Sequence, residues 1–271
     1  MNVSKPDSAL LLLGHGSTEN PDSSQPCWDH AEAIEREGLF GSVHCAFWKE
    51  EPNLRQIWPM IEESEVYVVP NFISEGYFTR QVLPRELELQ GHTTKRGELL
   101  VHYCDPVGIH PAMTGLLTKR ALEIVDEGVR PEETSLIVVG HGTGLNKKST
   151  EAIKVQVEAI RQSDVPFARV LDAYMEEAPF VADWRELTDT PNVVVVPFFI
   201  ADGLHSYQDI PVLLGIESEP TAAASQREVF RQNPYRMDGR TLYYSSAIGT
   251  DPSLARVILD QVAYFDEHYR T

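Results

Sequence analysis

A short apolar run that ends in glycine–histidine–glycine occurs twice in the chain. Residues Leu11–Gly16 contain the first copy and residues Leu136–Gly142 the second, so that His141 follows His15 by 126 residues. An unbroken apolar run indicates a strand that is buried on both faces, as in a parallel sheet. Glycine lets the backbone turn sharply at the end of such a strand and leaves the imidazole uncovered. Each histidine is therefore expected at the carboxyl edge of a sheet, where α/β proteins bind their ligands.

The repetition extends to the order of the predicted elements. Strands are predicted at residues 8–14, 43–48, 66–70 and 99–103, and again at 136–140, 169–175, 193–197 and 241–245. Helices are predicted through 31–34, after Pro52, and over 83–89 and 110–125, and again over 150–160, after Pro179, and over 210–214 and 252–264. Prolines and glycines recur with the same offset of 127 residues, as in Pro70 and Pro197 or Gly76 and Gly203. This self-similarity predicts an internal duplication.

Alternating strands and helices indicate parallel sheets with right-handed crossovers. We therefore predict an α/β fold with two tandem lobes, each a four-stranded parallel sheet flanked by helices, with a cleft between the lobes. The first lobe is expected at residues 1–128 and the second at 134–271, joined by the charged segment 126–133. Residues 218–239 are polar and have no clear counterpart in the first half, so an inserted loop or short helix is expected there.

Composition narrows the class of protein. The 271 residues are 42% hydrophobic and 24% charged, which is typical of a soluble globular protein. The net charge of −18 disfavours nucleic acid as a partner, because phosphate binding needs a basic face. No apolar run is long enough to cross a bilayer, and no signal peptide precedes the first strand. The three cysteines show no CxxC spacing, which predicts free thiols and a cytoplasmic location.

Three potential metal ligands follow strand ends in the second half: His141, Glu176 and His205. Because parallel strands end at the same edge of a sheet, these side chains are expected to converge. Two imidazoles and a carboxylate suit iron, cobalt, nickel or zinc, and three ligands leave positions open through which a metal can depart. In the competing interpretation the histidines are solvated, and Glu176 and Glu177 are a solvated carboxylate pair that the helix dipole favours at a helix start. Lys49 and Phe78 occupy the matching positions of the first half, which keeps only His15.

These motifs resemble the class II tetrapyrrole chelatases, the sirohydrochlorin cobaltochelatase/ferrochelatase group of CbiX/CbiK type. The matching segments cover both halves and are residues 12–17, 107–111, 139–143, 173–176 and 195–205. The resemblance implies two chelatase-like lobes and insertion of a divalent metal into sirohydrochlorin or a related tetrapyrrole. It also implies that His141, His205 and Glu176 contact the metal. Cobalt, iron or nickel is then a substrate of the reaction, and no organic cofactor is expected.

Metal insertion releases two pyrrole N–H protons, which calls for a base that is neutral at neutral pH. We predict that His141 is the principal base and ligand, while His205 and Glu176 hold or hand over the metal. The substrate carries many carboxylates, which conflicts with the negative charge of the chain, so local polar and basic groups must bind it. The candidates are Lys147, Lys148, Ser149 (the predicted N-cap of a helix), Thr143, Arg80 and His15.

Other classes of protein fit parts of this pattern. A non-catalytic metal or tetrapyrrole carrier would show the same ligands, and a pseudoenzyme that assembles with a partner stays an alternative. A hydrolase is disfavoured because the chain has no GxSxG nucleophile elbow. Two histidines and one glutamate do not distinguish cobalt from iron or nickel, because affinity order alone does not set selectivity. The sequence also leaves the oligomeric state open.

Overall fold

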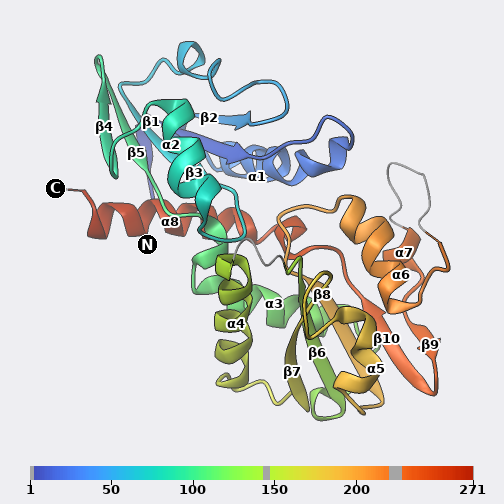
Figure 1. The fold of residues 1–271 in the computed structure, drawn as a ribbon. Coiled ribbons are helices and arrows are strands. Elements are labelled where there is room, and N and C mark those ends of the chain that lie inside the picture. Colours follow the sequence, from blue (N-terminus) through green and yellow to red (C-terminus); the bar gives the residue numbers. More distant parts are fainter. Residues whose placement is uncertain (1–2, 143–146, 220–227, 271) are drawn as a thin grey trace. The chain divides into compact units, whose positions relative to one another are not determined.

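The first apolar run forms β1, which is buried from Ser8 to Gly14. The computed structural model, which describes residues 3–142, 147–219 and 228–270, places β1 in a sheet of order β2-β1-β3-β5-β4 (Figure 1). The strands of this first sheet are β1 (Lys5–Gly14), β2 (Phe40–Phe47), β3 (Glu65–Pro70), β4 (Thr93–Arg96) and β5 (Leu99–Tyr103). Four of them are parallel, and β4 pairs antiparallel with β5 at the edge.

The second apolar run forms β6 in a sheet with the same topology, β7-β6-β8-β10-β9. The strands of this second sheet are β6 (Thr134–Gly140), β7 (Arg169–Tyr174), β8 (Asn192–Pro197), β9 (Tyr235–Met237) and β10 (Arg240–Tyr244). The predicted duplication and the four parallel strands per sheet are confirmed. The expectation that residues 218–239 have no counterpart is wrong at β9, because β9 corresponds to β4 of the first sheet; both pair antiparallel at an edge.

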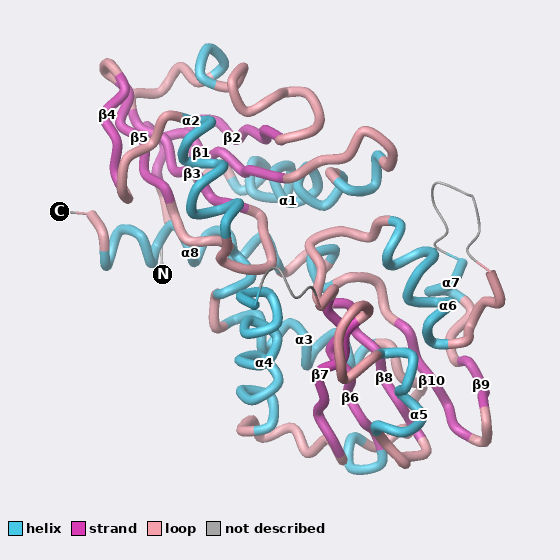
Figure 2. Tube along the Cα trace, viewed as in Figure 1, coloured by secondary structure: helices cyan, strands magenta, loops and turns pink. Residues whose placement is uncertain are grey.

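Helices follow most of the strands, as predicted (Figure 2). They are α1 (Gln25–Glu37), α2 (Leu83–Leu87), α3 (Ala112–Glu123), α4 (Lys147–Arg161), α5 (Trp184–Leu187), α6 (Ile210–Leu214), α7 (Glu228–Arg231) and α8 (Leu254–His268). A π-helical turn precedes two of them: η3 (Phe78–Val82) runs into α2, and η7 (His205–Asp209) runs into α6. Single 3-10 turns are η1 (Pro21–Ser23), η2 (Trp58–Met60), η4 (Val107–Ile109), η5 (Pro131–Glu133), η6 (Val181–Asp183) and η8 (Ile248–Thr250).

The helix predicted after Pro52 is wrong: this segment holds only turns and the 3-10 turn η2. The side chain of Asn53 accepts a hydrogen bond from the backbone N–H of Arg55 and donates one to the backbone oxygen of Trp48. Such local bonds compete with helical ones, because they satisfy the same backbone groups in another conformation. Proline in the first helical turn is therefore not a sufficient signal.

The last helix of each repeat packs on the sheet of the other repeat. Unit 1 comprises residues up to His110 together with those from Pro252 onward, and unit 2 is Pro111–Asp251. The helix α8, red in Figure 1, packs on β3, while α3 packs on β8 and α4. The compact units therefore divide the chain differently from the predicted lobes 1–128 and 134–271, which follow the repeat in the sequence. The segment 126–133 lies within unit 2 and does not link the two units.

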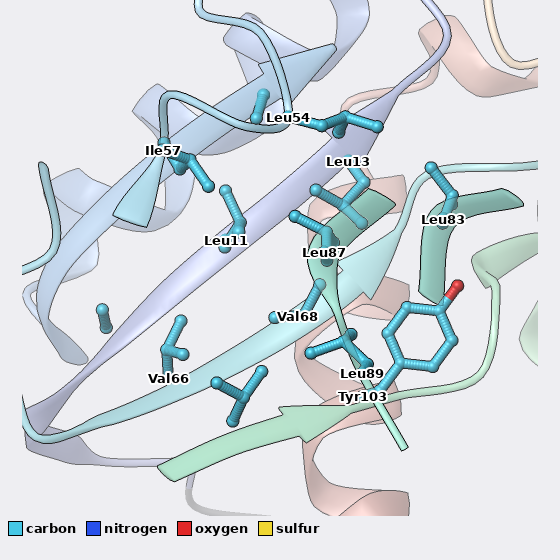
Figure 3. Close-up of a cluster of buried hydrophobic side chains, with 13 residues drawn as sticks. Leu11, Leu13, Leu54, Ile57, Val66, Val68, Leu83, Leu87, Leu89 and Tyr103 are labelled. Atoms are coloured by element: carbon cyan, nitrogen blue, oxygen red, sulfur yellow. The ribbon is translucent and has the colours of Figure 1, made fainter. Parts of the chain in front are cut away.

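Buried aliphatic side chains anchor the helices that follow the π-helical turns. In the first sheet, Leu11 and Leu13 pack with Leu83 and Leu87 of α2 (Figure 3). In the second sheet the equivalent cluster contains Ile137, Val139, Val193, Val195, Ile210 and Leu214. Burial of each such side chain contributes about 1.5–3 kcal/mol. Because α6 is anchored in this way, the turn η7 before it is held at the carboxyl edge of the second sheet.

Two further expectations concern the whole chain. The cysteines Cys27, Cys45 and Cys104 are buried free thiols, as predicted. Among the described residues, no helix combines the length and the apolar character that a membrane span needs.

Candidate metal site

His141 and Glu176 lie side by side because their strands are neighbours. His141 follows β6 and Glu176 follows β7, and the backbone N–H of Glu176 donates to the backbone oxygen of His141 at 3.1 Å. The first repeat pairs the same positions, since the N–H of Lys49 donates to the oxygen of His15 at 2.9 Å. In the second repeat the side chains also meet: His141 Nδ1 is 3.6 Å from Glu176 Oε2.

The glycines on both sides of His141 are closely packed, and the constraint is strongest at Gly142. A Cβ at Gly140 would lie 2.0 Å from Cδ1 of Ile153, and a Cβ at Gly142 would lie 2.4 Å from Cβ of Tyr174. Gly142 also has φ of +71°, a conformation that side chains with a Cβ rarely adopt. The positive φ of Gly142 agrees with the sharp turn that the sequence predicts after this strand.

His205 reaches the same edge from the loop after β8. Two hydrogen bonds hold this loop against the segment that follows β10. Asp202 Oδ1 accepts the backbone N–H of Ala247 at 2.7 Å, and the N–H of Gly249 donates to the backbone oxygen of Phe199 at 2.9 Å. The turn η7 then begins at His205. The ring centroids of His141 and His205 are 4.9 Å apart with an interplanar angle of 80°.

The hydrogen bonds of the two imidazoles differ. His205 Nδ1 is 2.6 Å from Asp209 Oδ2, whereas His141 Nδ1 is shielded from solvent and has no hydrogen-bond partner among the described residues. A separation of 3.6 Å is too long for a hydrogen bond to Glu176. It suits two ligands that each lie about 2.1 Å from one ion, at an angle of about 120°. An unpartnered nitrogen beside a carboxylate therefore fits a metal ion.

The three predicted ligands meet pairwise at His141. Within residues 3–142, 147–219 and 228–270, no group of three or more His, Cys, Asp or Glu side chains is arranged to hold a metal ion as it stands. The side chain of Glu176 is 58% exposed, so it can reorient, whereas that of His205 is 46% exposed and contacts Asp209. The structure thus brings the imidazoles together and places the carboxylate beside one of them.

The predicted substrate-binding residues of the second repeat lie on α4. This helix begins at Lys147, so Lys148 and Ser149 belong to its first turn and not to the preceding loop. Ser149 is therefore not the N-cap, and that expectation is wrong; the polar run continues directly into the helical pattern. Thr143 lies outside the described residues. Side chains on the first turn of α4 sit at the positive end of the helix dipole, which favours anions.

The predicted substrate-binding residues of the first repeat belong to unit 1. Arg80 is paired with Glu75 and lies 3.8 Å from Asp105, so its guanidinium already faces two carboxylates. The exposed His15 lies beside Phe78, with ring centroids 5.4 Å apart. The ring of Phe78 also stacks on another aromatic residue of this edge, Phe72, at 5.4 Å.

Three carboxylates at the edges of the two sheets were not predicted as site residues. Glu177 Oε1 accepts the hydroxyl of Thr150 at 2.6 Å, and its counterpart Glu50 accepts the N–H of Ser17 at 2.5 Å. Both therefore tie the edge to the segment that comes after the histidine turn. Their identity at equivalent positions of the two repeats was the available signal. The other missed carboxylate is Asp209, which lies one turn beyond His205.

Comparison with known proteins identifies the family of this chain. The CbiX family model matches the chain twice, at residues 9–124 and 135–264. A protein from Halobacterium salinarum named "Probable sirohydrochlorin cobaltochelatase" is 40% identical over 272 residues, which cover 94% of this chain and 90% of that protein. The sirohydrochlorin cobaltochelatase of Methanopyrus kandleri is 28% identical over 138 residues, which cover 47% of this chain and 94% of that protein.

Solved structures share the fold. DR2241 from Deinococcus radiodurans, a multi-domain protein with structural similarity to chelatases, has a TM-score of 0.76 and 29% identity over 94% of this chain and 54% of its own. SirB from Bacillus subtilis with Fe³⁺ has a TM-score of 0.71 and 18% identity, with 97% of this chain and 98% of its own covered. Because the family model matches both repeats and the Halobacterium relative is similar over nearly its whole length, this chain belongs to the CbiX family.

Proposed function

We propose that this protein inserts a divalent metal ion, Co²⁺ or Fe²⁺, into sirohydrochlorin or a closely related tetrapyrrole. The observation that carries the proposal is the meeting of His141 with His205 and Glu176 at one sheet edge, in a member of the CbiX family. The names of the relatives from Halobacterium and Methanopyrus, both sirohydrochlorin cobaltochelatases, support the same reaction.

In the proposed reaction, the second repeat binds the ion before the macrocycle takes it. His141 Nδ1 and Glu176 supply one nitrogen and one oxygen, and rotation of the exposed Glu176 side chain closes the gap to His205. Three protein ligands leave coordination positions free for the pyrrole nitrogens of the substrate. Because imidazole binds metal only when neutral, metal loading should weaken as protons compete for the histidines.

The same groups account for the protons. Insertion of one M²⁺ ion releases two N–H protons, since the two pyrrole nitrogens replace their hydrogens with bonds to the metal. His141, once it gives up the ion, is a base at the same sheet edge and can take one proton. Glu176 can take the other and pass it to solvent, because more than half of its side chain is exposed.

The carboxylates of the substrate need positive or hydrogen-bonding partners. In the second repeat we propose Lys148 and Ser149 on the first turn of α4, together with Lys147 and Thr143 close to them in the sequence. In the first repeat we propose Arg80 and His15. At a net charge of −18, the protein as a whole repels such an anion, so local contacts must dominate at short range. Arg80 would exchange its contact with Glu75 for one with the substrate.

The test measures insertion by the change in absorbance of sirohydrochlorin with Co²⁺, Fe²⁺ or Ni²⁺, using wild type, H141A, H205A and E176Q. Both histidine variants should lose most of the insertion rate, and H268A, which changes an exposed histidine on α8, should retain it. Wild-type rates in both H141A and H205A would contradict the proposal. Stoichiometric binding without turnover in wild type would favour a metal or tetrapyrrole carrier instead.

A further inference from the structure

Asp209 makes a short side-chain contact with one of the two imidazoles of the candidate metal site. Its Oδ2 atom lies 2.6 Å from Nδ1 of His205, four residues earlier in the turn η7. The ring of His205 is also flanked by Phe199, with centroids 6.1 Å apart and an interplanar angle of 33°. One edge of the imidazole is therefore engaged by a carboxylate, while the side chain as a whole is about half exposed.

We propose that Asp209 is a positioning residue for His205, an inference that rests on the proposed function of this site. An ionised carboxylate only accepts hydrogen bonds, so Nδ1 of His205 must carry the proton that joins them. In a neutral imidazole the lone pair then resides on Nε2. Asp209 thus fixes both the tautomer and the orientation of the ring, and it makes Nε2 the nitrogen that binds metal.

The first repeat argues against a purely structural role for Asp209. Its π-helical turn η3 forms at the equivalent place, with Phe78 where the second repeat has His205 and Val82 where it has Asp209. Val82 is buried, at 5% exposure, and the turn runs into α2 just as η7 runs into α6. The turn therefore needs no carboxylate at this position. Histidine and aspartate are present together in one repeat and absent together from the other.

The two imidazoles consequently have different roles. His141 Nδ1 has no hydrogen-bond partner among the described residues and lies near Glu176, so nothing in that part of the chain fixes its tautomer. His205 is held by Asp209 and presents Nε2 in a fixed orientation. The pair therefore divides into one imidazole whose Nδ1 lies beside Glu176 and one that Asp209 orients.

The first measurement is independent of metal and of activity. The ¹⁵N shifts of the His205 ring report which nitrogen carries the proton. Wild type should show His205 protonated on Nδ1, and D209V, which installs the residue of the first repeat, should shift it toward the Nε2-protonated tautomer. D209N keeps an acceptor and should retain the wild-type tautomer. An unchanged tautomer in D209V would overturn the proposal.

The second measurement is Co²⁺ affinity, followed by the visible absorbance of the bound ion without tetrapyrrole. Loss of a carboxylate that orients a metal-binding histidine typically weakens binding by about 10- to 100-fold. D209V should show that loss and D209N a smaller one. Equal loss in D209N, D209V and H205A would mean that Asp209 itself binds the ion, which contradicts a positioning role.

Two controls separate this inference from the proposed function. E65Q alters another histidine–carboxylate contact, His102 Nε2 to Glu65 at 3.0 Å in unit 1, and should leave Co²⁺ affinity unchanged. H205A must weaken Co²⁺ binding if the proposed site is correct. Wild-type affinity in H205A overturns the site, and this inference with it. Weak binding in H205A with wild-type affinity in D209V overturns only the role of Asp209.

Discussion

The carboxyl edges of the two sheets both carry a histidine after the first strand, but the side chains around that histidine differ. In the second repeat, His141 meets His205 and Glu176. In the first, His15 lies against Phe78, and Phe78 packs edge-on against Trp48 at 5.6 Å. Aromatic contacts of this kind stabilise by about 0.5–1.5 kcal/mol each but offer no metal ligand. The duplicated scaffold therefore does not by itself make a metal site.

What both repeats keep is the framework under the histidine. Glu50 and Glu177 brace the turn in each copy. A Cβ at Gly108 or Gly249 would lie within about 2 Å of a backbone oxygen in the loop above, so both loops rest directly on glycine. The residues that differ at the proposed site are side chains that project from this framework. The proposed function depends on those residues, because the fold alone does not specify it.

The largest predicted effect comes from converting the second repeat into the first. H205F installs the residue found at Phe78 and removes one of the three proposed ligands, so Co²⁺ affinity should fall on the order of 100-fold or more. Calorimetric titration with Co²⁺ measures it. F78A, the matched change in the first repeat, should leave the affinity unaltered. Equal losses in both variants would mean that the two edges are not functionally distinct.

A smaller effect should separate the matched glycines of the two turns. G142A places its Cβ 2.4 Å from Cβ of Tyr174, whereas G16A meets the flexible Glu50 side chain at 3.0 Å, and both residues have positive φ. Overpacking adds to the backbone cost only in G142A, so its free energy of unfolding should drop by about 2 kcal/mol more than that of G16A. Denaturant unfolding of both variants checks this difference. Equal losses would show that the second turn is not the more tightly packed.

The smallest predicted effect is a loss of folding stability at low pH, caused by two residues of unit 1. Burial lowers the pKa of His102, despite the opposing contact with Glu65. Burial raises the pKa of Glu65, but hydrogen bonds from Ser8 and His102 and the charge of Arg270 outweigh it, so this pKa lies below its ordinary value of 4.5.

Both shifts make the unfolded chain bind protons more readily than the folded one. Stability should therefore fall as the pH drops below about 6.5, the ordinary pKa of histidine, and again below about 4.5. Each group adds at most about 1.4 kcal/mol per pH unit. In the second repeat the matching residue is Tyr243, and a tyrosine does not titrate in this pH range. Thermal unfolding of H102Q should be less sensitive to pH between 6.5 and 5 than wild type. An unchanged slope would exclude His102 as the cause.

The sequence predicted the parts of the fold that depend on buried apolar runs. The eight parallel strands and the histidine edges follow from patterns that recur in both halves. The antiparallel strands β4 and β9 were missed because they are short and polar, as in Thr93–Arg96. The sequence did not predict that α3 and α8 each pack on the sheet of the other repeat. An amphipathic helix carries the same apolar pattern whichever sheet it covers.

The candidate site was predictable for a similar reason. His141, Glu176 and His205 each follow a strand, so topology alone brings them to one edge. Asp209 was missed because its partnership with His205 depends on the course of a π-helical turn, which the apolar pattern of the sequence does not predict. The start of α4 was misplaced because Lys147 and Lys148 look like loop residues before a serine cap.

The most direct test of the asymmetry between the repeats is the number of Co²⁺ ions that one chain binds. Calorimetry on the full chain, without tetrapyrrole, should give one equivalent for wild type and for H15A, and none in the same concentration range for the double variant H141A/H205A. Two equivalents in wild type, or one equivalent that survives in the double variant and disappears in H15A, would contradict the assignment of the metal site to the second repeat.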